Sequence, residues 1–394
     1  MLTPIYPVTG NESNSIPMIH YFTKEWVKLG YEVKVLLYPS NFPLIFYPIA
    51  RLFRNIIETR TGITIRTYRI KRNKYTIDGI DVNCIPLSKN KPHGRYKRDL
   101  IEKVAAESIE WCESQGFKPD VIIGHWINPQ MEIMNIMKNR WNVPTCLSLH
   151  DAAADFKSIY RDDYKKYLDN IDILGFRSKP IKERFFERFK VDKKWLYCFS
   201  GIPNDYITGN ENKSMENITN FIYIGRLIAR KFPAKIIEAL ASSEIKNWNI
   251  CYIGEGNEED KIKKTYKKYS DKGTLEMTGL IKRIKVREHL KKAQVFVMIS
   301  KSETFGFVYI EAMGAGCITI ASKGEGFDGI IEDGVNGFLC TAGDENELAS
   351  IFNRIKSMSV EERELMSRRA VDTAKNMTEN KVAKKYIDEI SRLL

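Results

Sequence analysis

Glu303 and Glu311 are carboxylates separated by seven residues in the segment 301–316, KSETFGFVYIEAMGAG. An apolar run precedes this segment, and such a run is typical of a buried strand in a parallel sheet. The pattern predicts that Glu303 lies just past the carboxyl end of the strand and that Glu311 lies in the following helix. Ligands of open α/β sheets bind at that end of the strands. Two carboxylates there, with Gly306 between them allowing close backbone approach, can accept hydrogen bonds from a sugar or a ribose. The alternative is a pair of solvated acids without a ligand.

Arg226 and Lys231 follow a second apolar run, residues 221–225, at the point where a helix is expected to begin. Arginine can bind a phosphate through two donors, and lysine supplies a point charge. Pro233 suits the first turn of that helix, whose amino terminus adds a positive dipole. These residues predict a phosphate site, whereas the alternative is a pair of surface cations.

Two glycine-containing turns lie in the same half of the chain. Gly254 and Gly256 flank Glu255 after a strand-like run, and residues 333–339 read DGVNGFL. A lone Gly-x-Gly is weak evidence, because it often forms only a turn. The order of the four segments is more informative than any one of them.

Together, in this order, the four segments resemble the large family four of retaining nucleotide-sugar glycosyltransferases, the glycosyl transferases group 1. The resemblance covers residues 221–340 and extends to the first half of the chain only in outline. It implies a GT-B fold, in which two doubly wound, Rossmann-like α/β domains face each other across a cleft. It also implies transfer of a hexose or hexosamine from a UDP- or GDP-linked donor to a hydroxyl acceptor, with no cofactor.

The resemblance implies roles for the residues of these segments. Glu303 would contact the donor sugar without acting as a covalent nucleophile, and Glu311 would hold the ribose hydroxyls. The other donor-binding residues would be Gly225, Arg226 and Lys231 at the diphosphate, Gly254 and Gly256 at the nucleobase, and the backbone around Phe305, Gly306 and Phe307. Two positions depart from the family pattern: Phe232 stands where relatives often carry glycine, and residues 323–329 differ in the loop that contacts the donor sugar.

Two of the five histidines follow apolar runs in the first half of the chain. His125 follows residues 121–124, and the pair His150-Asp151 follows residues 145–149. A single histidine is more often structural than functional. The family often places a similar His-Asp pair near the reacting sugar, so the resemblance makes His150 a catalytic candidate, with His125 and Asp151 as acceptor-side candidates.

No metal is expected at the reacting phosphates, because a metal-dependent site usually needs a carboxylate cluster such as Asp-x-Asp and none occurs in the chain. Arg226 and Lys231 would stabilise the departing diphosphate instead. The seven cysteines are scattered without close pairs, which favours a reducing compartment and predicts neither a zinc site nor disulfides.

The length of 394 residues predicts two domains. Short apolar runs alternate with helical spacers, which indicates parallel βαβ units. We expect an acceptor-binding domain over residues 1–205, a donor-binding domain over 206–378, and a final helix, 379–394, that crosses back to the first domain. The chain begins almost at its first loop, so either the first strand is very short or the sequence starts a few residues late.

A basic and apolar insert is expected over residues 41–98. Residues 51–98 contain 13 basic and 3 acidic side chains, so they carry +10 of the chain's net charge of +12. Residues 41–58 mix aromatic and aliphatic side chains with arginines, a composition that suits a bilayer interface; Phe42, Phe46 and Phe53 are the expected inserting residues. The alternative is a packing helix with a solvated basic face. No run is apolar and long enough to span a membrane, and no signal peptide is evident.

The scattered cysteines and the basic, apolar insert predict a cytoplasmic enzyme, peripheral on the inner face of the cell membrane, that binds an anionic lipid surface. The family resemblance implies that its acceptor is a lipid-linked glycan in the synthesis of a surface polysaccharide such as capsule or O-antigen, because relatives with such inserts commonly extend these glycans. A sugar-nucleotide epimerase or a phosphorylase of the same fold is an alternative. A further alternative is an inactive scaffold that binds membrane or nucleic acid, although no nucleic-acid motif accompanies the basic residues.

Overall fold

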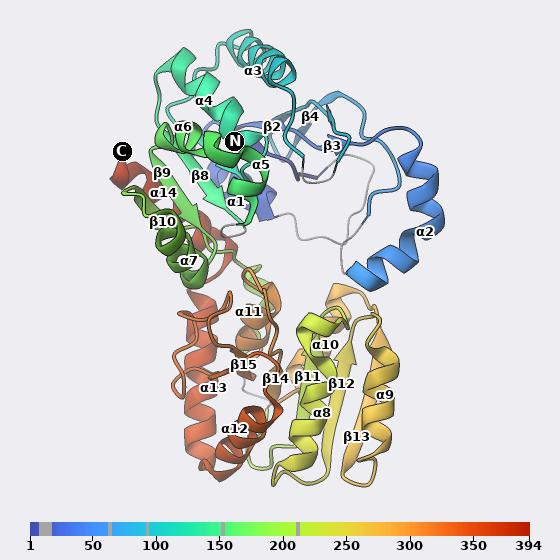
Figure 1. The fold of residues 1–394 in the computed structure, drawn as a ribbon. Coiled ribbons are helices and arrows are strands. Elements are labelled where there is room, and N and C mark those ends of the chain that lie inside the picture. The colour runs from blue at the N-terminus through green and yellow to red at the C-terminus, as the bar shows by residue number, and fades with distance from the viewer. Residues whose placement is uncertain (8–17, 62–64, 92–93, 151–153, 210–212) are drawn as a thin grey trace. The chain divides into compact units, whose positions relative to one another are not determined.

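A computed structural model describes residues 1–7, 18–61, 65–91, 94–150, 154–209 and 213–394 (Figure 1). The chain forms two compact units. The first contains Met1–Leu52, Arg66–Ser200 and Glu379–Leu394, and the second contains Phe53–Ile65 and Gly201–Thr378. The final helix therefore belongs to the first unit. Residues 53–65, which were expected to lie wholly with the first domain, are grouped with the second.

The first unit is built on a sheet of eight strands within the described ranges, in the order β10-β9-β8-β7-β1-β2-β5-β4. All neighbours in this sheet pair in parallel except β4 and β5, which are antiparallel. The strands are β1 (Leu2–Thr3), β2 (Lys34–Leu37), β4 (Asn73–Ile77), β5 (Ile80–Cys84), β7 (Ile122–His125), β8 (Thr145–Leu149), β9 (Ile173–Phe176) and β10 (Lys194–Tyr197). A separate parallel pair consists of β3 (Ser40–Asn41) and β6 (Leu87–Ser88).

Helices connect these strands as the alternating pattern predicts. They are α1 (Met18–Lys28), α3 (Arg98–Glu113), α4 (Gln130–Trp141), α5 (Ala154–Tyr160), the 3₁₀ turn η1 (Arg161–Asp163), α6 (Tyr164–Asp169), α7 (Lys179–Phe189) and α14 (Glu379–Leu393). The last of these packs on α1. The Trp26 indole donates to the Ala383 carbonyl at 2.8 Å, and Tyr386 lies 2.6 Å from the Ser148 hydroxyl. Helix α14 therefore completes the core of the first unit, far in sequence from the rest of that core.

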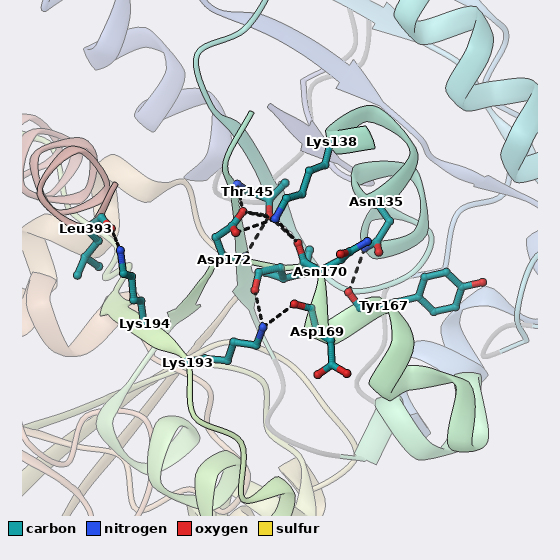
Figure 2. Close-up of polar contacts among 11 residues, drawn as sticks. Asn135, Lys138, Thr145, Tyr167, Asp169, Asn170, Asp172, Lys193, Lys194 and Leu393 are labelled. Carbon is teal, nitrogen blue, oxygen red and sulfur yellow. Dashed lines mark hydrogen bonds and ion pairs between the residues drawn. The ribbon is translucent and has the colours of Figure 1, made fainter. Parts of the chain in front are cut away.

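The amino-terminal edge of the first sheet is tied together by polar contacts (Figure 2). Lys138 of α4 donates to both Asp172 oxygens at 2.7 and 2.8 Å. The amide and hydroxyl of Thr145 also donate to Asp172, each at 2.8 Å. Burial would raise the pKa of Asp172, but these donors hold it below its usual value. The polar groups at this edge are hydrogen-bonded to one another. The carboxyl edge is therefore where a ligand is expected.

The second unit is built on a parallel sheet of six strands in its described part, in the order β13-β12-β11-β14-β15-β16. The strands are β11 (Asn220–Ile224), β12 (Trp248–Ile253), β13 (Gly273–Gly279), β14 (Val295–Val297), β15 (Ile318–Ser322) and β16 (Phe338–Cys340). The helical elements are η2 (Asn204–Tyr206), η3 (Ala229–Lys231), α8 (Pro233–Ser242), α9 (Glu259–Lys267), α10 (Arg283–Lys292), α11 (Phe307–Gly314), α12 (Glu345–Ser357) and α13 (Val360–Lys375). The predicted α/β class with two Rossmann-like units is confirmed.

Helix α2 (Phe46–Thr61) continues from the first unit into the second. Neither it nor any other helix in the described ranges is apolar enough over a sufficient length to cross a bilayer.

Each sheet has a switch point, where the strand order reverses and two neighbouring connections leave in opposite directions. In the first unit it lies between β1 and β7, and in the second between β11 and β14. The loops after these strands separate there and leave room for a ligand at the carboxyl edge. The fold therefore directs attention to the residues that follow β7, β11 and β14.

Candidate active site

The switch point of the second unit joins Lys231, which follows β11, to Glu303, which follows β14. The Lys231 ammonium lies 3.2 Å from a Glu303 carboxylate oxygen, and their side chains are 12% and 16% exposed. The two loops are also joined through the backbone, because the Lys301 amide donates to the Arg230 carbonyl at 2.8 Å. Two residues that are 72 positions apart are thus brought together as an ion pair at the sheet edge.

Arg226 lies between the end of β11 and Lys231 in the sequence. Its carbonyl accepts a hydrogen bond from the Tyr223 hydroxyl at 2.7 Å, and its side chain is half-exposed. The bond fixes the backbone of the loop just after the strand. Arg226 and Lys231 therefore both lie on the loop at the switch point, as the sequence predicts for a phosphate site.

The glycines of the two neighbouring loops are required by close backbone packing. A Cβ atom on Gly254 would lie 2.0 Å from the Gly225 carbonyl oxygen, and one on Gly256 would lie 2.1 Å from the Leu227 oxygen. The Leu227 amide donates to the Glu255 carbonyl at 2.9 Å. Any side chain at Gly254 or Gly256 would push these loops apart, so the glycines position the loop that carries the cations.

The loop before α11 is held against the loop after β15. Gly306 has a φ of 84°, and a Cβ atom there would lie 2.5 Å from the Tyr309 ring. The Glu325 carboxylate accepts from the Glu303 amide at 2.9 Å. Although residues 323–329 depart from the family pattern, Glu325 thus supports the backbone of Glu303. Phe305 is 3% exposed and packs on Phe327, so its side chain belongs to the core.

Glu311 lies inside α11 and is 5% exposed. Its carboxylate pairs with the guanidinium of Arg283, the first residue of α10. Burial raises the pKa of the Glu311 carboxyl, and the Arg283 charge opposes that rise. Arg283 also lies over the Tyr206 ring, 5.3 Å from its centroid. The sequence motifs did not identify Arg283 as a candidate site residue. The feature that could have identified it is its position shortly after β13, at the start of a helix.

Two imidazoles lie at the carboxyl edge of the first sheet, one at the end of β7 beside the switch point and one after the neighbouring β8. His125 Nδ1 lies 2.9 Å from His150 Nε2, and His125 has no exposed surface. Trp126 stacks on His150 with ring centroids 3.7 Å apart and an angle of 11° between the planes. The predicted acceptor-side pair of histidines therefore forms one cluster, whereas Asp151 lies outside the described residues.

The environment of this cluster keeps the imidazoles neutral. Burial, and then nearby charge, hold the pKa values of His125 and His150 well below 6.5. The nearby charge includes Arg177, which is 2% exposed and donates to the Cys198 carbonyl and the Ser200 hydroxyl. A neutral imidazole can donate or accept a hydrogen bond without carrying charge. Arg177 was missed because it is a single arginine after a strand, with no motif around it.

The chain is similar in sequence to known glycosyltransferases. The family model described as glycosyl transferases group 1 matches residues 209–373. An uncharacterized glycosyltransferase of Methanocaldococcus jannaschii is 29% identical over 265 residues, which are 66% of this chain and 72% of the relative. The alpha-monoglucosyldiacylglycerol synthase of Acholeplasma laidlawii is 26% identical over 46% of this chain, which spans about half (48%) of that relative.

Solved structures resemble the chain over nearly its whole length. The Anabaena protein HepE, in complex with UDP, superposes with a TM-score of 0.67 at 15% identity over 99% of this chain and 98% of its own. A trehalose-6-phosphate structure from E. coli bound with UDP-2-fluoro glucose superposes with a TM-score of 0.67 at 10% identity, over 100% of this chain and 99% of its own. At these identities the likeness concerns the fold. The chain is a glycosyltransferase with the GT-B fold, and its residues 209–373 match the glycosyl transferases group 1.

Proposed function

We propose that the protein is a retaining glycosyltransferase that moves a hexose or hexosamine from a nucleoside diphosphate to a hydroxyl of a lipid-linked glycan. The observation that carries the proposal is the meeting of Lys231 and Glu303 at the switch point of the second unit. A diphosphate binds cations, and the hydroxyls of a sugar bind groups that accept hydrogen bonds. The two loops supply a cation and a carboxylate that lie within hydrogen-bonding distance of each other.

In the proposed reaction the bond between the anomeric carbon and the phosphate oxygen breaks, and its electron pair stays on the phosphate. Arg226 and Lys231 stabilise this charge. The acceptor oxygen bonds to the anomeric carbon on the same face of the sugar, and the acceptor proton passes to the departing phosphate. Glu303 positions donor hydroxyls, Glu311 holds the ribose, and the neutral His150 hydrogen-bonds a sugar hydroxyl.

A panel of UDP-, GDP- and ADP-sugars in a thermal-shift assay tests the donor. The donor that binds raises the melting temperature by mass action, so it is identified without knowledge of the acceptor. No shift with any nucleotide sugar would contradict the proposal. Turnover of the donor without an acceptor would instead favour an epimerase.

The acceptor class is supported by helix α2, which exposes an apolar stripe. Its members recur at helical spacing and are 43–77% exposed: Ile49, Leu52, Phe53 and Ile56. Ile45, which is 73% exposed, lies just before the helix. Phe42 and Phe46 differ from expectation, since they are half-buried and their rings pack on each other at a tilt of 42°, with centroids 4.8 Å apart. The inserting residues are therefore mainly aliphatic. Together with the +10 charge of residues 51–98, the stripe suits an anionic bilayer surface.

Vesicle sedimentation tests this part of the proposal. The protein should bind anionic vesicles more strongly than neutral ones, and salt should weaken binding through screening. Replacing Leu52 and Ile56 with Ser, or Arg51, Arg69 and Lys71 with Gln, should release the protein and leave donor binding intact. Equal binding to neutral vesicles, or none to anionic ones, would contradict it.

A further inference from the structure

Three side chains from different elements of the second unit converge away from the donor loops. They are Cys251 on β12, Glu276 on β13 and His289 on α10, and their ligand atoms all lie within 4.8 Å of one another. Cys251 and Glu276 are cross-strand neighbours in the parallel register, so the sheet fixes their separation. His289 approaches from the helix, with its Nδ1 3.6 Å from the Cys251 sulfur.

The geometry of this cluster suits a tetrahedral ion. Zinc binds a thiolate at about 2.3 Å and an imidazole at about 2.0–2.1 Å, so the sulfur and nitrogen of a tetrahedral site lie about 3.5 Å apart. The observed 3.6 Å matches that edge without movement of β12 or α10. Glu276 is exposed, so its side chain has room to rotate its carboxylate toward the ion.

We propose that Cys251, Glu276 and His289 form a Zn²⁺ site with a fourth position open to water. A thiolate and an imidazole select zinc over magnesium or calcium, which prefer oxygen ligands. When zinc binds, the thiol proton is released to solvent and the sulfur coordinates as the thiolate. Cys251 is half-buried while the other six cysteines are buried, so it is the accessible thiol of the chain.

The position of the site gives it a structural role. Strand β12 leads directly into the Gly254–Gly256 turn, and α10 begins at Arg283, the partner of Glu311. An ion that joins β12, β13 and α10 therefore stabilises the scaffold under the donor loops. Because its ligands lie within β12, β13 and α10 and outside the loops that carry Lys231 and Glu303, the ion is assigned no part in phosphate departure. The sequence patterns did not predict this site because its residues are far apart in the chain. Cys251 and Glu276 are separated by 25 positions, and Glu276 and His289 by 13.

The test uses the full-length protein stripped of metal with a chelator and then titrated with Zn²⁺ or Co²⁺. Zinc should bind one ion per chain, raise the melting temperature more than the same concentration of Mg²⁺, and protect one thiol from Ellman's reagent. Cobalt should show a thiolate-to-metal charge-transfer band. Cys251→Ser and His289→Gln should each lower zinc affinity about tenfold or more, as loss of one of three ligands predicts.

Glu288→Gln is the matched control, because this exposed acid is adjacent to His289 on α10 and pairs with Lys285 on the same helix. It should leave zinc affinity unchanged. The absence of a charge-transfer band, or equal zinc affinity in wild type and His289→Gln, would overturn the proposal. If Cys251→Ser fails to fold, the cobalt spectrum of His289→Gln still decides the outcome.

Discussion

The two switch points differ in how they satisfy their polar groups. In the second unit, Lys231 and Glu303 are oppositely charged and compensate each other, as do Arg283 and Glu311. In the first unit, His125 and His150 are hydrogen-bonded imidazoles whose pKa values burial lowers. One edge therefore holds mutually compensating ion pairs, and the other holds neutral imidazoles in an aromatic setting, with the buried Arg177 nearby.

This difference indicates how each edge would treat a ligand. Internal ion pairs at the second edge can be exchanged, because an incoming phosphate can take the place of Glu303 at Lys231. At the first edge a cationic ligand would have to be desolvated beside uncharged rings and near the Arg177 cation, which is costly. A neutral hydroxyl fits there without that cost. The following predictions test this contrast, beginning with the largest effect.

Removing a cation from the second edge should cause the largest loss. Lys231→Ala and Arg226→Ala should each lower turnover by about 10²-fold or more, because a preorganised stabiliser of the departing phosphate is lost. Initial-rate assays with the identified donor would measure this. Lys246→Ala, an exposed lysine of the same unit, is the control and should keep wild-type rates. Turnover of both site variants within a few-fold of wild type would remove the phosphate role.

The two carboxylates should separate binding from chemistry. Glu311→Gln should weaken the affinity for free nucleoside diphosphate by about tenfold, the loss expected when one charge-assisted hydrogen bond is removed. Glu303→Gln should lower kcat with a smaller change in that affinity. Calorimetric titration and single-turnover rates would distinguish the two. If the diphosphate binds Glu311→Gln as tightly as wild type, the assignment of Glu311 to the ribose is wrong.

The histidine pair should make the first unit sensitive to acid. Because the folded pKa values lie below 6.5, each imidazole takes up a proton on unfolding as the pH falls below that value. The stabilisation is thus complete above pH 6.5 and is lost on acidification, by up to about 1.4 kcal/mol per pH unit for each histidine. Urea unfolding of wild type and His125→Gln at pH 7.5 and 5.5 measures this.

The variant should lose less stability than wild type between the two pH values, whatever its stability at pH 7.5. An equal pH dependence of the two proteins would show that His125 does not carry the effect.

Substitution of Phe232 should have the smallest effect, a small change in the free energy of unfolding. This residue adopts a φ of 48°, in the left-handed region, and its ring lies against the backbone of Gly343. The conformation costs about 1 kcal/mol in a residue with a side chain, and burial of half the ring returns about as much. Phe232→Gly should therefore change the free energy of unfolding by less than about 1 kcal/mol. A loss above about 2 kcal/mol in urea denaturation would show that ring packing dominates.

Sequence alone determined the alternation of strands and helices and the order of the motifs in the second unit. Apolar runs of four to six residues predict buried parallel strands because both faces of such a sheet are covered. That rule located β8 at residues 145–149 and placed Glu303 past the end of β14. Glycine and charge at strand ends then indicated the proposed donor site, since short-range spacing is sufficient to describe one loop.

Tertiary structure alone decided which distant residues meet. Three contacts depend on strand order and helix placement, which no local pattern encodes. They are Arg283 with Glu311, Arg177 with the histidines, and His289 with Cys251. The same holds for α2, where packing left Phe46 half-buried and Leu52 exposed although both are apolar. Local sequence sets the period of an element, but the face that it buries is chosen by the surfaces available to cover it.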